Sequence, residues 1–302
     1  SSRLPSSAGS SCQWSPGFEL PPRGSSLNSV GGGLGIRFVE EPEPTSSSSS
    51  SSSSDLMRGV LIAVRNELTH TLTGDALPKS KQVDAAVVYR STNSGKSFTI
   101  HGSLSDWTSE ADLIFLNSTT SEQVVLAAAR YQGPSHFASA RYDMGVLTNA
   151  TSVSYKRTAV FRSTDGGATF GTPGLVTGQG QQSASFVQLS NGRLVLAFGH
   201  KDAGEGQKFI MSYDSGVSWS NGVWDLHHGG LYASSVSVGK DEIVTAYSCA
   251  TDPQSTCPER GGRLSTLQWK PPAYEEVARA GFFFPVRPDG ARDPSTMWEN
   301  VP

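Results

Sequence analysis

The sequence has few of the residues that crosslink small domains or bind metal ions. It contains 3 cysteines and 6 histidines among 302 residues, which excludes a disulfide-rich scaffold and leaves no zinc-finger spacing. No apolar run approaches the roughly 18 residues of a membrane-spanning helix. A formal net charge of −3 provides no general attraction for nucleic acid. We therefore expect no metal ion, no cofactor, no nucleic-acid partner and no transmembrane segment.

Glycine, in contrast, is abundant, with 32 residues, and part of it belongs to a pattern that occurs three times. The pattern is S-x-[DN]-x-G-x-[ST]-[FW], and we call its copies the repeat turns: Ser91–Phe98, Ser163–Phe170 and Ser212–Trp219. Asp or Asn accepts hydrogen bonds from backbone amides one or two residues further on, while Gly adopts the positive φ of a tight turn. The pattern therefore predicts hairpin tips whose final aromatic residue packs back onto a sheet.

Each repeat turn follows an apolar run that is typical of a strand. A second set of apolar runs precedes these strands and can be aligned by pattern: Val60–Val64, Val124–Ala129, Arg193–Phe198 and Glu242–Tyr247. Polar turns such as Ser190-Asn-Gly192 are hairpin signals. Regular repetition of paired strands favours a repeat architecture, and four antiparallel units are evident.

The repeat turns resemble the Asp-box, or bacterial neuraminidase repeat, of sialidase-like β-propellers. The resemblance covers residues 57–270 and implies an all-β fold with six blades, of which four are evident in the sequence. The other blades come from the N-terminal region and the tail, or the propeller is incomplete and the chain is a fragment. In such proteins the turn is structural and lies on the face opposite the active site.

Three regions follow from this organisation. Residues 1–56 are rich in Ser, Gly and Pro, with one candidate first-blade strand, Leu34–Val39, and an unbroken serine run at 46–54 that is expected to be a disordered loop. Residues 57–270 form the propeller. Residues 271–302 form a tail whose Phe282-Phe-Phe-Pro285 segment needs a surface, either on the propeller or on a protein partner.

Two local features favour the secretory pathway. Cys249 and Cys257 flank a short polar loop and either form a local disulfide in an oxidising compartment or remain free thiols. Asn117 and Asn149 begin triplets that fit N-glycosylation sites.

The aligned strands also indicate a binding site. The residues that follow them are Arg65, Arg130, His200 and Ser248, and in a propeller equivalent positions of successive blades emerge on one face. Two arginines there would bind a carboxylate or sulfate through paired, charge-assisted hydrogen bonds. The alternative is that each arginine is a solvated strand end, paired with a neighbour such as Glu67 or Asp143.

The resemblance implies a catalytic set as well: three arginines on the sugar carboxylate, a tyrosine nucleophile activated by a glutamate, and an aspartic acid as general acid. A neutral tyrosine suits an anomeric carbon that already carries a carboxylate, because an anionic nucleophile would be repelled. Arg37 falls at the first-blade arginine of the family if the serine run is a loop insertion before Gly59, with an exposed arginine beside a disordered segment as the alternative. Asp75 matches the acid, with a simple turn residue as the alternative.

The match to the tyrosine and the glutamate is incomplete. Tyr232 resembles the nucleophile, but the best strand alignment places Ala233 at that position and Tyr232 on the other side of the pleat. Glu205 is the nearest candidate for its activating carboxylate. Before the third repeat turn, Lys208 occupies the position where an arginine is expected. Its ammonium group is a point charge and lacks the paired donors with which a guanidinium binds a carboxylate.

Two functions remain open at this point. The chain is a sialidase-like glycoside hydrolase acting on terminal acidic sugars, or it is a non-catalytic propeller that binds a glycan or a protein. The incomplete arginine set and the displaced Tyr232 favour the binding propeller, whereas the equivalent positions of Arg65 and Arg130 and the loop that carries Asp75 favour the hydrolase.

Overall fold

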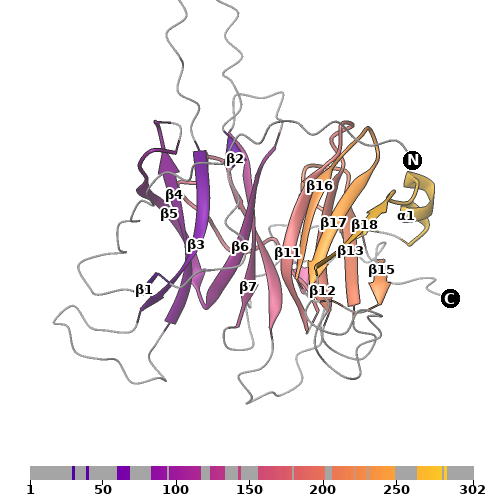
Figure 1. Ribbon diagram of the computed structural model, residues 1–302, viewed down its shortest axis with the longest axis horizontal. Helices are drawn as coiled ribbons and strands as arrows, with labels where there is room; N and C mark the ends of the chain where they lie inside the picture. The colour runs from indigo at the N-terminus through magenta and orange to yellow at the C-terminus, as the bar shows by residue number, and fades with distance from the viewer. Residues whose placement is uncertain are drawn as a thin grey trace, which may run out of the picture.

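The structure, a computed structural model, is built almost entirely of β-strands (Figure 1). It describes residues 29–30, 39–40, 60–68, 83–93, 95–116, 123–132, 142–143, 156–178, 180–200, 206–220, 222–228, 230, 232–248, 264–280 and 282–283. Within this part of the chain, the one helix is the short α1 (Tyr274–Ala280).

The strands form four successive blades, which are antiparallel except for one short parallel pair at the edge of the second blade. The first contains β3 (Val60–Leu68), β4 (Val83–Ser91) and β5 (Thr99–Asp106), with β1 (Ser29–Val30) and β2 (Val39–Glu40) both paired with β3. The second contains β6 (Thr108–Phe115), β7 (Val125–Tyr131), β9 (Arg157–Ser163), β10 (Leu175–Val176) and β8 (Tyr142–Asp143). The third contains β11 (Gln181–Gln188), β12 (Leu194–His200), β13 (Gly206–Ser212) and β15 (Trp224–His228), and the fourth contains β16 (Ala233–Ser237), β17 (Ile243–Ser248) and β18 (Leu264–Trp269). These are the four units expected from the sequence.

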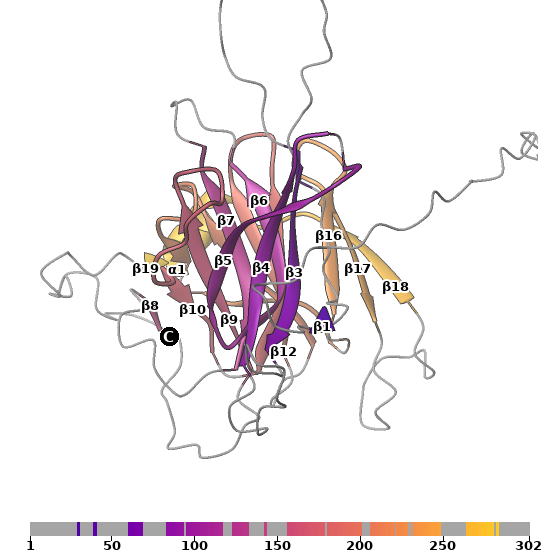
Figure 2. The ribbon, with the colours of Figure 1, turned by 90° about the vertical axis from the view of Figure 1, so that its left-hand side faces the viewer.

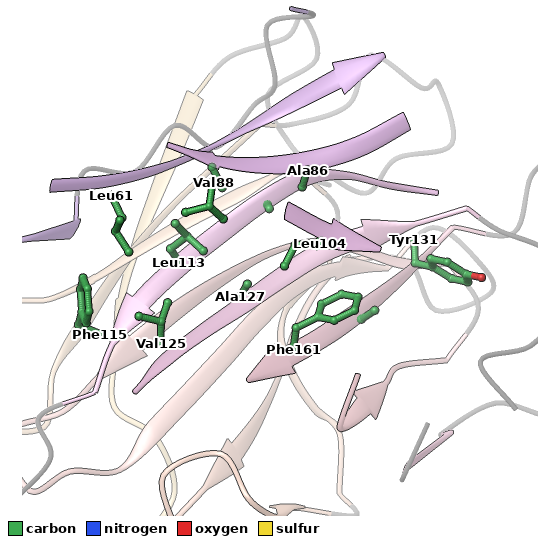
Figure 3. Close-up of a cluster of buried hydrophobic side chains, with 14 of the residues drawn as sticks. Leu61, Ala86, Val88, Leu104, Leu113, Phe115, Val125, Ala127, Tyr131 and Phe161 are labelled. Atoms are coloured by element: carbon green, nitrogen blue, oxygen red, sulfur yellow. The ribbon is translucent and has the colours of Figure 1, made fainter. Parts of the chain in front are cut away.

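Each blade packs face to face against the next through apolar side chains. Alternate residues of a strand point to opposite faces, so β7 serves two cores: Val125 and Ala127 face the first blade, and Leu126 faces the third. Figure 3 shows the first of these cores, in which Leu61 and Val88 of the first blade meet Leu113 and Val125 of the second. The apolar runs of the sequence are continuous because both of their faces are buried.

The three repeat turns have the same hydrogen-bond pattern. In the second turn, Asp165 Oδ1 accepts hydrogen bonds from Ser163 Oγ at 2.6 Å and from the Thr169 amide at 2.9 Å. In the third turn, Asp214 Oδ1 accepts from the Ser218 amide at 2.8 Å. In the first turn, Asn93 Oδ1 accepts from the Ser97 amide at 2.9 Å. The Asp or Asn therefore accepts a backbone hydrogen bond as predicted, but from the amide four residues further on instead of one or two.

The glycine of each turn has a positive φ, at 81° for Gly95, 92° for Gly167 and 79° for Gly216. Of the final aromatic residues, Phe98 and Trp219 are buried, at 6% and 1% exposure, whereas Phe170 is half-buried against the core between the first two blades. The expectation of burial holds fully for two of the three.

The second and third turns also contact the preceding blade. His101 Nε2 of β5 lies 3.2 Å from the carbonyl oxygen of Gly166 in the second turn. Gly102 lies so close to that turn that a Cβ there would be 2.4 Å from the Gly167 carbonyl oxygen. In the same way, Arg162 Nη1 of the second blade donates to the Ser215 carbonyl oxygen of the third turn at 2.9 Å. The turns therefore join neighbouring blades.

The fourth blade is followed by a helix where the others have a repeat turn. Helix α1 comes after β18, and its Val277 is fully buried in the core that contains Val195 and Met211 of the third blade. Tyr274 packs edge-on against Tyr213 of the third turn, with ring centroids 4.9 Å apart. Beyond the helix, β19 (Phe282–Phe283) pairs with β14 (Trp219–Ser220) at the end of that turn.

The described blades form an open arc. The face of the fourth blade that points away from the third carries exposed apolar side chains, with Val236 at 53%, Val238 at 51% and Leu264 at 72% exposure. When the molecule is turned by 90° (Figure 2), β3, β4 and β5 face the viewer and β18 lies at the far edge. The described residues thus form an all-β β-propeller of four blades that do not close into a ring.

Candidate functional site

The two ends of the blades differ in chemistry. The repeat turns lie at one end, and the opposite end, which we call the site face, consists of the starts of β6, β9, β11 and β13 and the ends of β7 and β12. Nine polar or charged side chains are buried at the site face: Thr108, Ser109, Arg130, Arg157, Thr158, Gln181, Gln182, Ser183 and Gln207. Buried polar groups need hydrogen-bond partners, and a ligand at this end of the blades could supply them.

The strand register tests which residues occupy equivalent positions. Arg65 pairs with Ala86 of β4, and Arg130 pairs with Thr158 of β9; these two partners stand equally far before Ser91 and Ser163. The equivalence of the two arginines is therefore confirmed at the level of the backbone. The side chain of Arg65 lies outside the described part of the structure.

The same register corrects the position given to His200. Gly199 pairs with Gln207 and so occupies the position equivalent to Arg130, while His200 pairs with Gly206, one residue further along β12. Because successive residues of a strand face opposite sides, the half-buried His200 belongs to the other face of its blade. The sequence alignment missed this because it was anchored on the apolar run and overlooked the glycine that ends it.

Two β-bulges re-aim side chains at the site face. In β6, one extra residue, Glu110, lies between Ser109, which pairs with Arg130, and Ala111, which pairs with Ala129. In β11, the register shifts between Gln182 and Ser185, and Ser183 has a positive φ of 56°. A non-glycine residue in this region costs about 1–3 kcal/mol and persists only where its surroundings hold it.

These bulges bring four side chains together from neighbouring blades. Arg130 Nη1 donates to Glu110 Oε1 at 2.7 Å, and its Nε donates to Ser109 Oγ at 3.0 Å. Ser183 Oγ donates to the second oxygen of Glu110, Oε2, at 3.1 Å. The side chains of Arg130 and Glu110 are 8% and 10% exposed, so the ion pair is screened little by water. One carboxylate thus links the second blade to the third.

The adjacent Tyr131 is unsuited to act as a nucleophile. It is 6% exposed and packs in the core between the first two blades. Burial raises its pKa above the ordinary value, and the nearby positive charge of Arg157 offsets this only in part. Its phenol therefore remains protonated at neutral pH.

The remaining candidates are placed only in part. Tyr232 is half-buried and immediately precedes β16, whose first residue Ala233 pairs with Tyr247. Arg37, Asp75 and Glu205 lie outside the described residues, as do the three cysteines and both glycosylation triplets. Of the proposed acid, nucleophile and activating glutamate, the described residues include Tyr232 alone.

In the described part of the chain there is no cluster of three or more His, Cys, Asp or Glu side chains suited to a metal ion. No helix among the same residues is long and apolar enough to cross a membrane.

Sequence reasoning missed Glu110 and Ser183. Both lie in strands whose pattern is otherwise regular, and a bulge leaves no clear mark in a single sequence. The one available signal is the run of polar residues Thr108-Ser-Glu110 at the start of an apolar strand. The prediction of strands from apolar runs did not use this polar segment.

Comparison with known proteins gives similarity to solved structures alone: no family model and no curated protein matches this sequence. The GH93 α-L-arabinofuranosidase of Fusarium graminearum is 13% identical, with a TM-score of 0.46, and the match covers 71% of this chain and 60% of that chain. A Hadza microbial sialidase is 15% identical, with a TM-score of 0.41 and coverage of 63% and 32%. The NanB sialidase of Streptococcus pneumoniae is 14% identical, with a TM-score of 0.40 and coverage of 64% and 26%. This chain spans less than two thirds of the length of each of these proteins, and at such identities no activity or residue role passes from them to it.

Proposed function

We propose that this chain is a sialidase-like glycoside hydrolase that acts on terminal acidic sugars, with its site on the site face around Arg130, Glu110 and Ser183. The observation that carries the proposal is the pair of equivalent bulges in β6 and β11, which place Glu110 and Ser183 in contact. Bulges are common beside active sites because they re-aim a side chain without breaking the sheet.

The chemistry of this cluster suits an acidic sugar. Glu110 and Ser109 engage two nitrogen atoms of the Arg130 guanidinium and fix its plane. The third, Nη2, has no hydrogen-bond partner among the described residues and can donate to a ligand carboxylate. A guanidinium held in this way loses little conformational entropy on binding, and its charge-assisted hydrogen bonds are stronger than neutral ones.

The catalytic assignment extends this proposal through the family resemblance. Asp75 serves as general acid, Tyr232 as nucleophile and Glu205 as the carboxylate that activates it, while Arg37 and Arg65 complete the clamp on the sugar carboxylate. The tyrosine attacks the anomeric carbon and forms a glycosyl–enzyme bond as Asp75 protonates the leaving oxygen; water then releases the sugar.

A second candidate function is a non-catalytic propeller that binds a glycan or a protein. It is favoured by one feature of the cluster: Glu110 neutralises the charge of Arg130, so the pair offers hydrogen bonds without net positive charge. Such a site suits hydroxyl groups at least as well as a carboxylate.

A fluorogenic sialoside assay across pH distinguishes these functions. We expect hydrolysis by the wild type, a loss on the order of 100-fold or more in turnover for Asp75→Asn and Tyr232→Phe, and weaker substrate binding for Arg130→Lys. Lys270→Gln, which removes an exposed charge paired with Glu242, serves as the matched control and keeps full activity. Binding of the sugar without hydrolysis would leave the binding propeller, and neither binding nor hydrolysis would contradict the hydrolase and leave a propeller that binds another glycan or a protein.

A further inference from the structure

The third blade carries, at its site face, a row of side chains that the Arg130 cluster does not use. Gln182 of β11 pairs with Gly199 of β12, which pairs with Gln207 of β13. Directly opposed residues of antiparallel neighbours project to the same face of a sheet. The two glutamine side chains therefore lie on one face, on either side of a residue without a side chain. We call these three residues the glutamine row.

Both glutamines are completely buried and have no partner. Gln182 and Gln207 are each 0% exposed, and neither the amide nitrogen nor the oxygen of either side chain makes a hydrogen bond among the described residues. Burying an amide without a hydrogen bond is one of the costly defects of a folded protein, and native structures carry few of them. Four such atoms in one row call for a partner that the described chain does not supply.

The equivalent row of the second blade shows how such a position is filled. There the row is Ser109, Arg130 and Thr158, and the arginine side chain in the middle donates to Ser109. Gly199 stands where Arg130 stands, so the third blade has two amides and no central side chain to bond them. The amide donors and acceptors of Gln182 and Gln207 are therefore present, but the side chain that would bond them is missing.

The glutamine row faces the seam between the third and fourth blades. On the same face of the third blade, Ser185 Oγ accepts a hydrogen bond from the Ser235 amide of the fourth blade at 3.1 Å. His227, which pairs with Gln207, packs against Tyr247 of the fourth blade with ring centroids 4.9 Å apart. Two strand spacings separate the glutamine backbones by about 10 Å. A hydroxyl oxygen about 2.8 Å from each of the two amide groups would fit between side chains held at that spacing.

We propose that the glutamine row is a hydroxyl-binding site in the seam between the third and fourth blades. A hydroxyl group both donates and accepts, so it bonds the oxygen of one amide and the nitrogen of another, and the uncharged pair of amides suits a neutral ligand. Its source is either an internal water molecule or the hydroxyl group of a sugar bound at the site face. A water molecule could bind there whatever the function of the protein, whereas binding of a sugar hydroxyl group rests on the proposed function.

A crystal structure of the wild-type protein, together with thermal unfolding of three variants, tests the site. We expect electron density for an oxygen atom within hydrogen-bond distance of both amides. Gln182→Met, Gln207→Met and Gly199→Ala should each lower Tm by about 2–10 °C, because they remove a partner of that oxygen or fill its place. Gln268→Met is the matched control, since its amide bonds Glu242 on the surface, and it should change Tm by less than about 2 °C.

Addition of N-acetylneuraminic acid or galactose distinguishes the two sources. If a sugar hydroxyl occupies the row, the sugar raises Tm of the wild type and of Gln268→Met but not of Gln207→Met; if water occupies it, any sugar-induced shift is equal in all of them. The proposal is overturned if no density lies between the amides and the methionine variants are as stable as the wild type or more so. Should a variant fail to fold, the wild-type density decides. Failure to hydrolyse sialosides affects none of these readouts and would count against the proposed function alone.

Discussion

The repeat turns and the site face are two ends of the same blades, and the hydrogen bonds that shape each end differ in range. At the repeat turns, hydrogen bonds join residues two to four positions apart, such as Ser163 Oγ to Asp165 and the Thr169 amide to Asp165. At the site face, Ser183 bonds Glu110 across 73 positions of sequence. Local contacts form whenever the short sequence is present, whereas the site face requires two blades to be in place. The difference separates a modular scaffold from a site that depends on the whole arrangement.

The largest expected effect is loss of the Arg130–Glu110 pair at the site face. Arg130→Met should lower the free energy of unfolding by about 3–5 kcal/mol, because it leaves the carboxylate of Glu110 buried without its partner. Urea unfolding measures this. The double variant Arg130→Met/Glu110→Gln should recover most of the loss, and a single variant as stable as the wild type would show that the pair does not hold the blades together.

The contact between the second turn and the first blade should be the next most sensitive. Gly102→Ala places a Cβ 2.4 Å from the Gly167 carbonyl oxygen and 2.7 Å from that of Ala168, and the backbone must move at a cost of about 1–3 kcal/mol. Gly171→Ala is the matched control, because a Cβ there has nothing within 4 Å. Equal urea midpoints for the two variants would contradict the close packing of this turn.

Removal of a turn carboxylate should have a smaller effect. Asp165→Ala deletes acceptors for Ser163, the Thr169 amide and the Thr169 hydroxyl, and we expect a loss of about 1–2 kcal/mol. Asn93→Ala, at the same position of the first turn, should cost less because the lost hydrogen bonds are not charge-assisted. Thermal unfolding measures the loss of stability in both variants. A larger loss for Asn93→Ala than for Asp165→Ala would contradict this ranking.

These contrasts explain what the sequence could predict. The strands, the blades and the turn hydrogen bonds follow from patterns within a few residues of one another, such as Ser212, Asp214 and Ser218. The site did not follow in the same way. Glu110 and Ser183 meet only because two strands contain bulges, and a bulge does not change the apolar pattern of the sequence. Gly199, and not His200, occupies the position equivalent to Arg130, a difference of one residue that the apolar pattern does not reveal. Arg130 was predicted as a site residue, but its buried partner was not.

The smallest expected effect is a pH dependence confined to the second turn. Hydrogen bonds from Ser163 and Thr169 lower the pKa of Asp165 from 3.8 to about 2. A carboxylate with a lowered folded-state pKa stabilises the fold above its unfolded pKa, and this contribution is lost as pH falls from about 4 towards 2. The stability difference between the wild type and Asp165→Asn should therefore shrink over that range. A difference that stays constant would show that the charge of Asp165 contributes nothing.

Hydrogen–deuterium exchange with and without N-acetylneuraminic acid tests the central claim most directly, because it reports which end of the blades meets the ligand. We predict slower exchange in the segments at the site face, residues 108–111, 129–131 and 181–185, with no change in the repeat turns at 163–170 and 212–219. In Arg130→Met the protection should disappear. Protection of the repeat turns, or of no segment at all, would contradict the assignment of an acidic-sugar site to the site face.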